Sequence, residues 1–81
     1  MTKEKIAKDA YRKLKYFYDN KILIHFKDFN EIFYNGEIID LDPTIMSMTF
    51  KERVRGVIPF LLEDVNPDSI FMFKDGGGKK V

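Results

Sequence analysis

A glycine inside an apolar, strand-like segment is the feature that most constrains the fold of this chain. Gly36 follows Phe33 and Tyr34, and the apolar pattern continues after it through Ile38–Leu41. A glycine within a strand marks a bulge, a bend or the close approach of another backbone. Two interpretations are open at this point. Asn35-Gly36 forms a tight hairpin turn, for which Asn-Gly is the strongest dipeptide signal, or Gly36 bends one long strand.

The composition limits the chain to one domain with a small core, since it has 81 residues. It has no cysteine, so neither a disulfide nor a thiolate metal site supports that core. Tight packing and self-association remain as ways to stabilise such a small core. Its 14 Lys and Arg against 13 Asp and Glu leave a formal net charge of +1, which excludes a strongly basic protein that coats nucleic acid.

The hydropathy pattern gives no sign of membrane insertion or export. No apolar run approaches the roughly 20 residues that span a bilayer. The amino terminus lacks the apolar core and small-residue cleavage site of a secretion signal. We therefore expect a soluble, cytoplasmic protein.

The first segment predicts an amphipathic helix over residues 3–19. Ile6, Ala10, Leu14 and Phe17 recur at helical spacing, and Thr2 is a suitable N-cap. The other face of this helix is strongly basic. It is either a solvated surface or one that follows nucleic-acid phosphates. Its basic residues are Lys3, Lys5, Lys8, Arg12, Lys13 and Lys15.

After Lys21 the hydrophobic period changes from about 3.6 residues to about 2, which predicts strands. We expect five, at about residues 21–28, 31–41, 45–50, 57–62 and 69–74. One helix before five evenly spaced strands is typical of a mainly β, SH3-like antiparallel barrel with a helix across one end. Such a barrel needs one long, strongly bent strand, which favours the bend at Gly36. Residues 1–74 then form one domain, and residues 75–81 a flexible tail.

The fourth and fifth predicted strands are apolar on both faces. A small barrel has only one interior, so their outward faces must be covered by the helix or by another copy of the chain. We expect a homo-oligomer joined through these strands, with fuller burial within the chain as the alternative. Pro59 has no N–H, so strand pairing around it must be interrupted. The expected interface residues are Val57, Ile58, Phe60, Leu62, Ile70, Phe71, Met72 and Phe73.

From Thr2 to about Lys74 the chain resembles the Sm-like family, the RNA-associated ring proteins that include Hfq in bacteria and the Sm-like proteins of archaea and eukaryotes. The resemblance, which is to a divergent archaeal-type member, rests on the helix-then-five-strand order and on the segment from Phe33 to Ile38. The family signature has a glycine in the second strand and then an aspartate, which Gly36 and Asp42 match. The resemblance implies an Sm-fold barrel and rings in which the fourth strand pairs with the fifth strand of the next subunit.

The uridine pocket of the family matches less well. Its stacking residue and its asparagine correspond to Thr44 and Met46 here, and the turn between Glu63 and Asp68 has neither arginine nor glycine. Any RNA is therefore expected on the basic helix face, helped by arginines before the fourth strand. Tyr11, Tyr16 and Tyr18 either add stacking or pack at the rim. The candidate RNA contacts are Lys5, Lys8, Arg12, Lys15, Arg53, Arg55 and Asp42.

Three classes of function remain in view. The first is an RNA-associated ring subunit, and the second is a self-assembling structural or protein-interaction module without RNA binding. An enzyme is disfavoured because His25 is the only histidine and no nucleophile motif is present. Asp40 and Asp42 share a strand side and suit a hard cation, although an Asp-Pro turn explains Asp42. We expect no catalytic residue, no cofactor and no metal.

Overall fold

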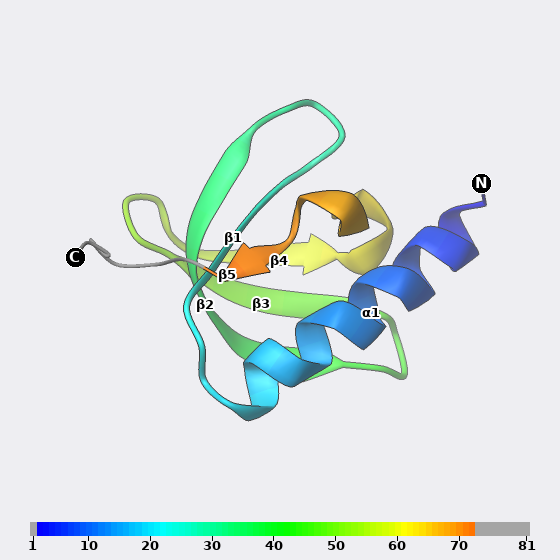
Figure 1. The fold of residues 1–81 in the computed structure, drawn as a ribbon, viewed down its shortest axis with the longest axis horizontal. Coiled ribbons are helices and arrows are strands. Elements are labelled where there is room, and N and C mark those ends of the chain that lie inside the picture. The colour runs from blue at the N-terminus through cyan, green and yellow to red at the C-terminus, as the bar shows by residue number, and fades with distance from the viewer. Residues whose placement is uncertain (1, 73–81) are drawn as a thin grey trace.

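The computed structural model describes residues 2–72 and contains one helix and one five-stranded sheet (Figure 1). The sheet order is β4-β3-β2-β1-β5, and every pair of neighbours is antiparallel. The fold is therefore mainly β with an amino-terminal helix, as predicted. Its elements are α1 (Lys3–Asp19), β1 (Ile24–Lys27), β2 (Phe33–Asp42), β3 (Ser47–Glu52), β4 (Gly56–Leu61), the short 3-10 helices η1 (Leu62–Asp64) and η2 (Pro67–Ser69), and β5 (Phe71–Met72).

The sheet is open, because β4 and β5 lie at its two outer edges and do not pair with each other within residues 2–72. The structure thus has the bent, five-stranded sheet that the sequence predicts, but not the closure that defines a barrel. Residues 75–81, for which a flexible tail was predicted, lie outside the described residues, as does Phe73.

The helix begins and ends through local hydrogen bonds. The Thr2 hydroxyl accepts the Lys5 N–H at 3.2 Å, which is the predicted N-cap. At the other end Lys21 adopts a positive φ of 53°. Its N–H donates to Tyr18 O (3.2 Å), and the Ile22 N–H donates to Phe17 O (3.0 Å). This is a Schellman motif, and it delays the first strand to Ile24 rather than residue 21.

Gly36 lies inside β2 and is the residue at which that strand changes partner. Residues before it pair with β1 and residues after it with β3, while Gly36 itself faces Ile24 on one side and Glu52 on the other. A Cβ at Gly36 would overlap the carbonyl oxygen of Lys51, whose carbonyl carbon lies only 2.9 Å from that position. The Asn-Gly hairpin is therefore wrong, and the long strand curves through both halves of the sheet (Figure 1).

The core fills the space between the two halves of the bent sheet and α1. Phe26 contacts Phe50 and Phe60 edge to face, with ring centroids 5.0 and 5.3 Å apart. The helix packs against η1 and β2 and buries Leu14 completely. Burial of one such side chain stabilises the fold by about 1.5–3 kcal/mol. The core thus uses one face of each strand and leaves the outer face of the sheet without a covering layer among residues 2–72.

Candidate functional site

The two outer strands carry apolar side chains that remain exposed. Val57 and Leu61 of β4 are 59% and 51% exposed, and Phe71 and Met72 of β5 are 57% and 48% exposed. Three of these four belong to the interface predicted from the sequence. Leu61 does not, because the prediction chose Leu62 in its place.

The other predicted interface residues lie elsewhere. Alternation along β4 turns Ile58 and Phe60 toward the core, where both are half-buried. Leu62 and Ile70 are buried core residues, since the chain leaves the sheet at η1 and returns to it only at Phe71. Leu62 and Ile70 are therefore unavailable to a partner at the surface, whereas Ile58 and Phe60 remain partly exposed.

The backbone of β4 also presents hydrogen-bonding groups at the sheet edge. The Leu62 N–H donates to Met46 O at 2.9 Å, and Ser47 is the register partner of Leu61. In an antiparallel ladder this bond makes the Ser47–Leu61 pair a non-hydrogen-bonded one, and the two kinds of pair alternate along the strand. The backbone groups directed away from β3 are therefore those of Val57, Pro59 and Leu61. Pro59 offers only its carbonyl.

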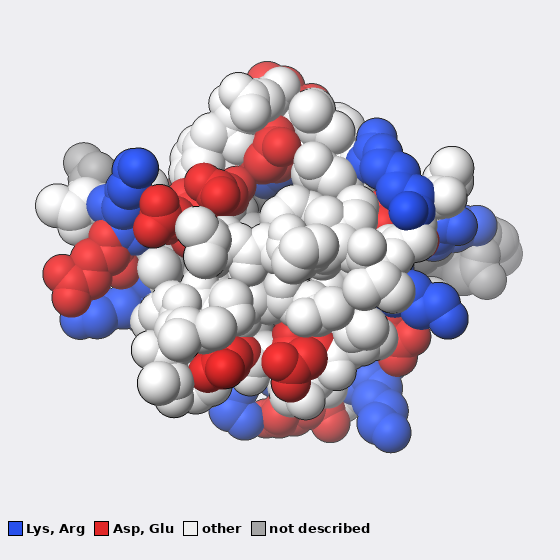
Figure 2. Space-filling view, turned by 180° about the vertical axis from the view of Figure 1, so that it is seen from behind, with Lys and Arg blue, Asp and Glu red and all other residues white. Residues whose placement is uncertain are grey.

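The face turned away from the viewer in Figure 1 has an uncharged centre with Lys, Arg, Asp and Glu around it, as Figure 2 shows. This distribution is typical of a surface that loses water on contact with a partner, because charged side chains are depleted at the centre of such surfaces.

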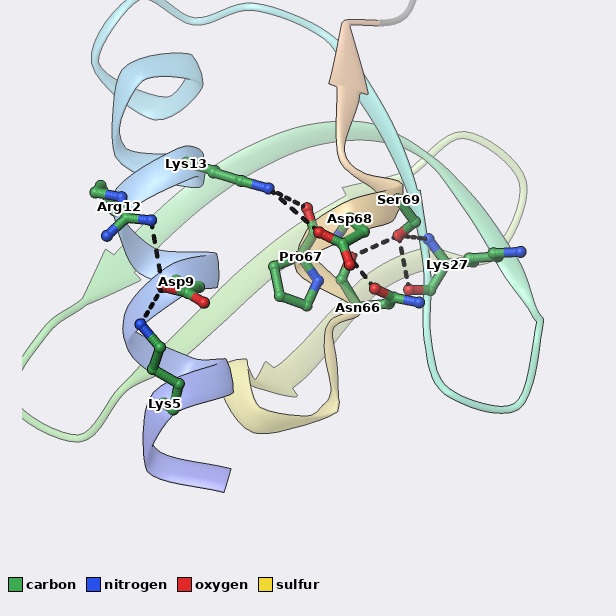
Figure 3. Close-up of polar contacts among 9 residues, drawn as sticks. All are labelled: Lys5, Asp9, Arg12, Lys13, Lys27, Asn66, Pro67, Asp68 and Ser69. Carbon is green, nitrogen blue, oxygen red and sulfur yellow. Dashed lines mark hydrogen bonds and ion pairs between the residues drawn. The ribbon is translucent and has the colours of Figure 1, made fainter. Parts of the chain in front are cut away.

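Four of the six basic residues of α1 are paired with carboxylates on the same helix. Asp9 accepts from Arg12 Nη2 at 3.2 Å and lies 3.6 Å from Lys5 Nζ (Figure 3). Lys8 lies 3.7 Å from Glu4. Each of these basic side chains is mostly exposed, so the pairs are weak. A phosphate would compete with a carboxylate at each of them.

Lys15 is held more closely than the others. Its Nζ donates to Asp19 Oδ2 at 2.7 Å. This hydrogen bond raises the pKa of Lys15, an effect that its own desolvation opposes and the charge of Asp19 reinforces. The four RNA contacts predicted on the helix do lie along one side of α1, but each of them is paired with a carboxylate. They are Lys5, Lys8, Arg12 and Lys15.

The two remaining basic residues of the helix reach toward the carboxyl-terminal part of the sheet. Lys13 Nζ donates to Pro67 O at 3.0 Å and lies 3.7 Å from Asp68 in η2 (Figure 3). Lys3 lies 3.5 Å from Glu63 in η1. These contacts fix α1 across the connection between β4 and β5.

The predicted arginines lie in the turn between β3 and β4, away from the helix-face set. Arg55 Nη1 donates to Phe33 O at 3.0 Å, and the guanidinium lies 4.8 Å from the Tyr34 ring centroid. Arg53 donates its N–H to Asn35 O at 2.8 Å. Both residues therefore tie the turn to β2, which is a structural role.

Glu52, a buried acid in this turn, was not singled out from the sequence. Its Oε1 accepts from Val54 N (2.9 Å) and Arg55 N (2.8 Å), and its Oε2 accepts from Asn35 N (3.0 Å). Burial acts to raise the pKa of Glu52, but the three backbone donors together outweigh it, so the pKa is lowered. The carboxylate holds β2 and the turn together.

The segment from Asp42 to Met46 forms a turn. Asp42 Oδ1 accepts the Thr44 N–H at 2.8 Å, which is the turn-forming role expected of an Asp-Pro pair. Met46 has a φ of 49° and packs against the core. Thr44 and Met46, which correspond to the stacking residue and the asparagine of the uridine pocket, offer neither a ring nor an amide to a base.

The outer face of β1, β2 and β5 contains an aromatic cleft that sequence reasoning did not find. His25 lies with its ring centroid 6.4 Å from that of Phe33 and 5.8 Å from that of Phe71. These residues come from three strands and meet only through the pairing of β1 with β2 and β5. Alternation places each of them on the outer face, but the sequence gives no register between the strands.

Residues 2–72 contain neither a group of side chains that suits a metal ion nor a membrane-spanning helix. No three His, Asp or Glu side chains come together there in a way that suits a metal ion. The helix of this part of the chain is too short and too polar to cross a bilayer. No protein-family model, curated protein or solved structure matches the chain.

Proposed function

We propose that the chain is a self-assembling module whose copies join by pairing the β4 edge of one with the β5 edge of the next. The observation that carries this proposal is the presence of two outer strands with exposed apolar side chains on one small chain. Two different edges that fit each other give a head-to-tail contact, which closes into a ring when the rotation between copies allows it. A ring of the Sm-like kind follows from the same resemblance that predicts the fold.

Both backbone and side chains support this pairing. On β4, Val57 and Leu61 direct N–H and C=O groups outward, and their exposed side chains stand on the same outer face. Phe71 of β5 stands on the outer face as well, beside His25. Pairing the two edges therefore aligns apolar side chains in one row while satisfying backbone groups that otherwise bond to water.

Substitutions on the outer face of β4 test the proposal without disturbing the core. We expect the native chain to have a mass several times its 9.6 kDa in native mass spectrometry and light scattering. The double variant Val57→Lys, Leu61→Lys places two charges on the contact and is expected to give monomers. Val54→Lys is the matched control, because Val54 is 90% exposed at the tip of the turn and lies outside the edge. A native chain that stays monomeric at micromolar concentration contradicts the proposal.

A second candidate function is RNA binding along α1, favoured by the spacing of Lys5, Lys8, Arg12 and Lys15 on one side of the helix. Phosphates must displace carboxylates there. Asp9→Asn releases Lys5 and Arg12, so it should tighten RNA binding at low salt if the helix is the site. Unchanged affinity in this variant, or no retention of RNA in a filter assay at low salt, contradicts this second candidate.

A further inference from the structure

The aromatic cleft is a surface depression whose rings lie outside the hydrophobic core. It has a volume of about 470 Å³, within the usual range for ligand sites. Its lining residues are His25, Lys27, Phe33, Asn66, Asp68, Ser69 and Phe71.

The two phenylalanines of the cleft are largely exposed and do not belong to the hydrophobic core. Phe33 is 55% exposed and Phe71 57% exposed, although the core has its own aromatic cluster around Phe26. His25 lies between them in the sheet, tilted by 23° to Phe33 and by 36° to Phe71. Rings from three adjacent strands therefore form a nearly continuous aromatic platform on the outer face.

Polar groups surround this platform. Lys27 Nζ lies 5.7 Å from the Phe33 ring centroid and donates to Glu31 at 2.8 Å. Asn66 Oδ1 accepts the Asp68 N–H at 3.0 Å, which leaves the Asn66 Nδ2 donor without a partner within residues 2–72. The Asp68 carboxylate is 92% exposed. The rim thus offers a cation, an amide donor and a carboxylate acceptor.

The backbone under the rim is held in place. Ser69 Oγ accepts the Lys27 N–H at 2.9 Å and lies 2.7 Å from Asn66 O and 3.1 Å from Lys27 O (Figure 3). The Asn66 N–H donates to Lys27 O at 3.1 Å. These bonds join η2 to β1, so the polar groups keep their positions relative to the rings without a ligand.

We propose that this cleft binds single-stranded nucleic acid by stacking bases on Phe33 and Phe71. Exposed rings suit any base, since every base has a π-face. Lys27 supplies a charge for a phosphate, which must displace the Glu31 carboxylate from it. The Asn66 amide and Asp68 carboxylate match the donors and acceptors on the edge of a base. A proline-rich peptide also uses aromatic grooves, and its free carbonyls could accept from the Asn66 amide. Its prolines have no N–H for the Asp68 carboxylate and it carries no phosphate for Lys27, so the rim favours a nucleotide.

This proposal shares Phe71 with the proposed contact between copies, because Phe71 belongs to the outer strand β5. Phe33 belongs to β2 and lies on neither edge strand, so variants at Phe33 test the cleft without changing the edges. The proposal is separate from binding along α1. A cleft with one or two phosphate contacts gives a slope of log affinity against log salt of about −0.7 to −1.4, whereas four contacts along the helix give about −2.8.

The first test measures the binding of labelled ten-nucleotide RNA and DNA homopolymers by fluorescence anisotropy. Phe33→Ala should weaken binding about 5- to 150-fold, the usual effect of losing one stacking ring. Phe29→Ala is the matched control, because Phe29 is 51% exposed but lies outside the cleft. Equal affinity of the native chain and Phe33→Ala, or no binding to any of the oligonucleotides, overturns the proposal.

The second test reports stacking directly. The chain has four tyrosines but no tryptophan, so Phe33→Trp introduces a single tryptophan whose emission can be excited selectively at the red edge of its absorption. We expect oligonucleotides to quench its emission while the emission of Phe29→Trp stays unchanged. Quenching of both variants alike, or quenching of Phe33→Trp by a proline-rich peptide and not by oligonucleotides, overturns the proposal.

Discussion

At the scale of single residues, Gly36 decides how the sheet is built. Its role is spatial rather than conformational, because the position that a Cβ would occupy is taken by the backbone of Lys51. The sequence predicts this residue from its place in an apolar segment. What the sequence does not contain is the identity of the backbone that comes close, since that depends on the pairing of β2 with β3.

Gly36→Ala is expected to destabilise the protein by at least about 1–3 kcal/mol, because the methyl group forces the backbones of β2 and β3 apart. Asn35→Ala is the matched control and should change the free energy of unfolding by less than about 0.5 kcal/mol, since Asn35 is a strand residue here. Chemical denaturation measures both. A larger effect of Asn35→Ala would favour the Asn-Gly turn that the structure contradicts.

Glu52 is a residue whose role follows from three backbone donors. Because its pKa is lowered in the folded protein, its ionised form stabilises the fold above the pKa of the unfolded chain. That stabilisation disappears as the pH falls through the lower, folded pKa. Glu52 could not be selected from the sequence, because it stands in a charged stretch where acids are usually solvated.

Glu52→Gln should therefore lower the unfolding temperature at neutral pH and have a decreasing effect as the pH falls below about 4. The amide keeps one acceptor and places a donor against a backbone N–H. Thermal unfolding of both proteins between pH 3 and pH 7 measures this. A constant difference across that range would contradict the role assigned to the carboxylate.

At the scale of elements, the helix was the easiest part to predict and the strand ends were the hardest. The bounds of α1 follow from a cap and a period that lie within the segment itself. The start of β1 depends on a left-handed Lys21, and the end of β4 on a turn into η1 that buries Leu62. Those choices are made by tertiary packing, which local patterns do not contain.

The ion pairs of α1 could likewise be predicted only in part from local patterns. Counting residues along the sequence gives a basic face, but the structure pairs its side chains with Glu4, Asp9 and Asp19. All three of these acids lie four residues from their lysines, a spacing visible in the sequence. The pairing with Glu63 and Asp68 was not visible, because η1 and η2 come from the other end of the chain.

Ser69 is the residue that attaches η2 and β5 to β1. Ser69→Ala should lower the free energy of unfolding by about 1–3 kcal/mol, because it leaves the Lys27 N–H without its acceptor. Ser47→Ala is a change of the same size at a half-buried residue of β3, and it should lower the free energy of unfolding by about 0.5 kcal/mol or less. Denaturant unfolding compares the two variants. Equal effects would mean that the Ser69 hydrogen bonds contribute little.

At the scale of the whole molecule, the sheet is open. Within residues 2–72 each outer strand has a neighbour on only one side and keeps apolar side chains exposed. The apolar character of both outer strands was visible in the sequence. Their separation at opposite edges was not, because it follows from the strand order and from the bend at Gly36. The aromatic cleft could not be predicted for the same reason, because it forms only when β1 pairs with β2 and β5.

If copies of the chain stabilise each other, the unfolding temperature should rise with protein concentration. A hundredfold increase in concentration adds up to about 2.7 kcal/mol per contact by mass action, which corresponds to a rise of up to roughly 10–20 °C for a domain of this size. Differential scanning calorimetry at two concentrations measures this shift. In the Val57→Lys, Leu61→Lys variant the unfolding temperature should not depend on concentration.

Pro59 has a consequence for how far any such sheet can grow. A strand that adds to β4 meets a donor from Val57 and another from Leu61, with only a carbonyl between them. An incoming strand that is long and flat must leave one of its own acceptors unsatisfied there, while a short one avoids the gap. The edge is thus a poor template for fibril growth, and its proline guards an otherwise apolar strand against amyloid-like stacking.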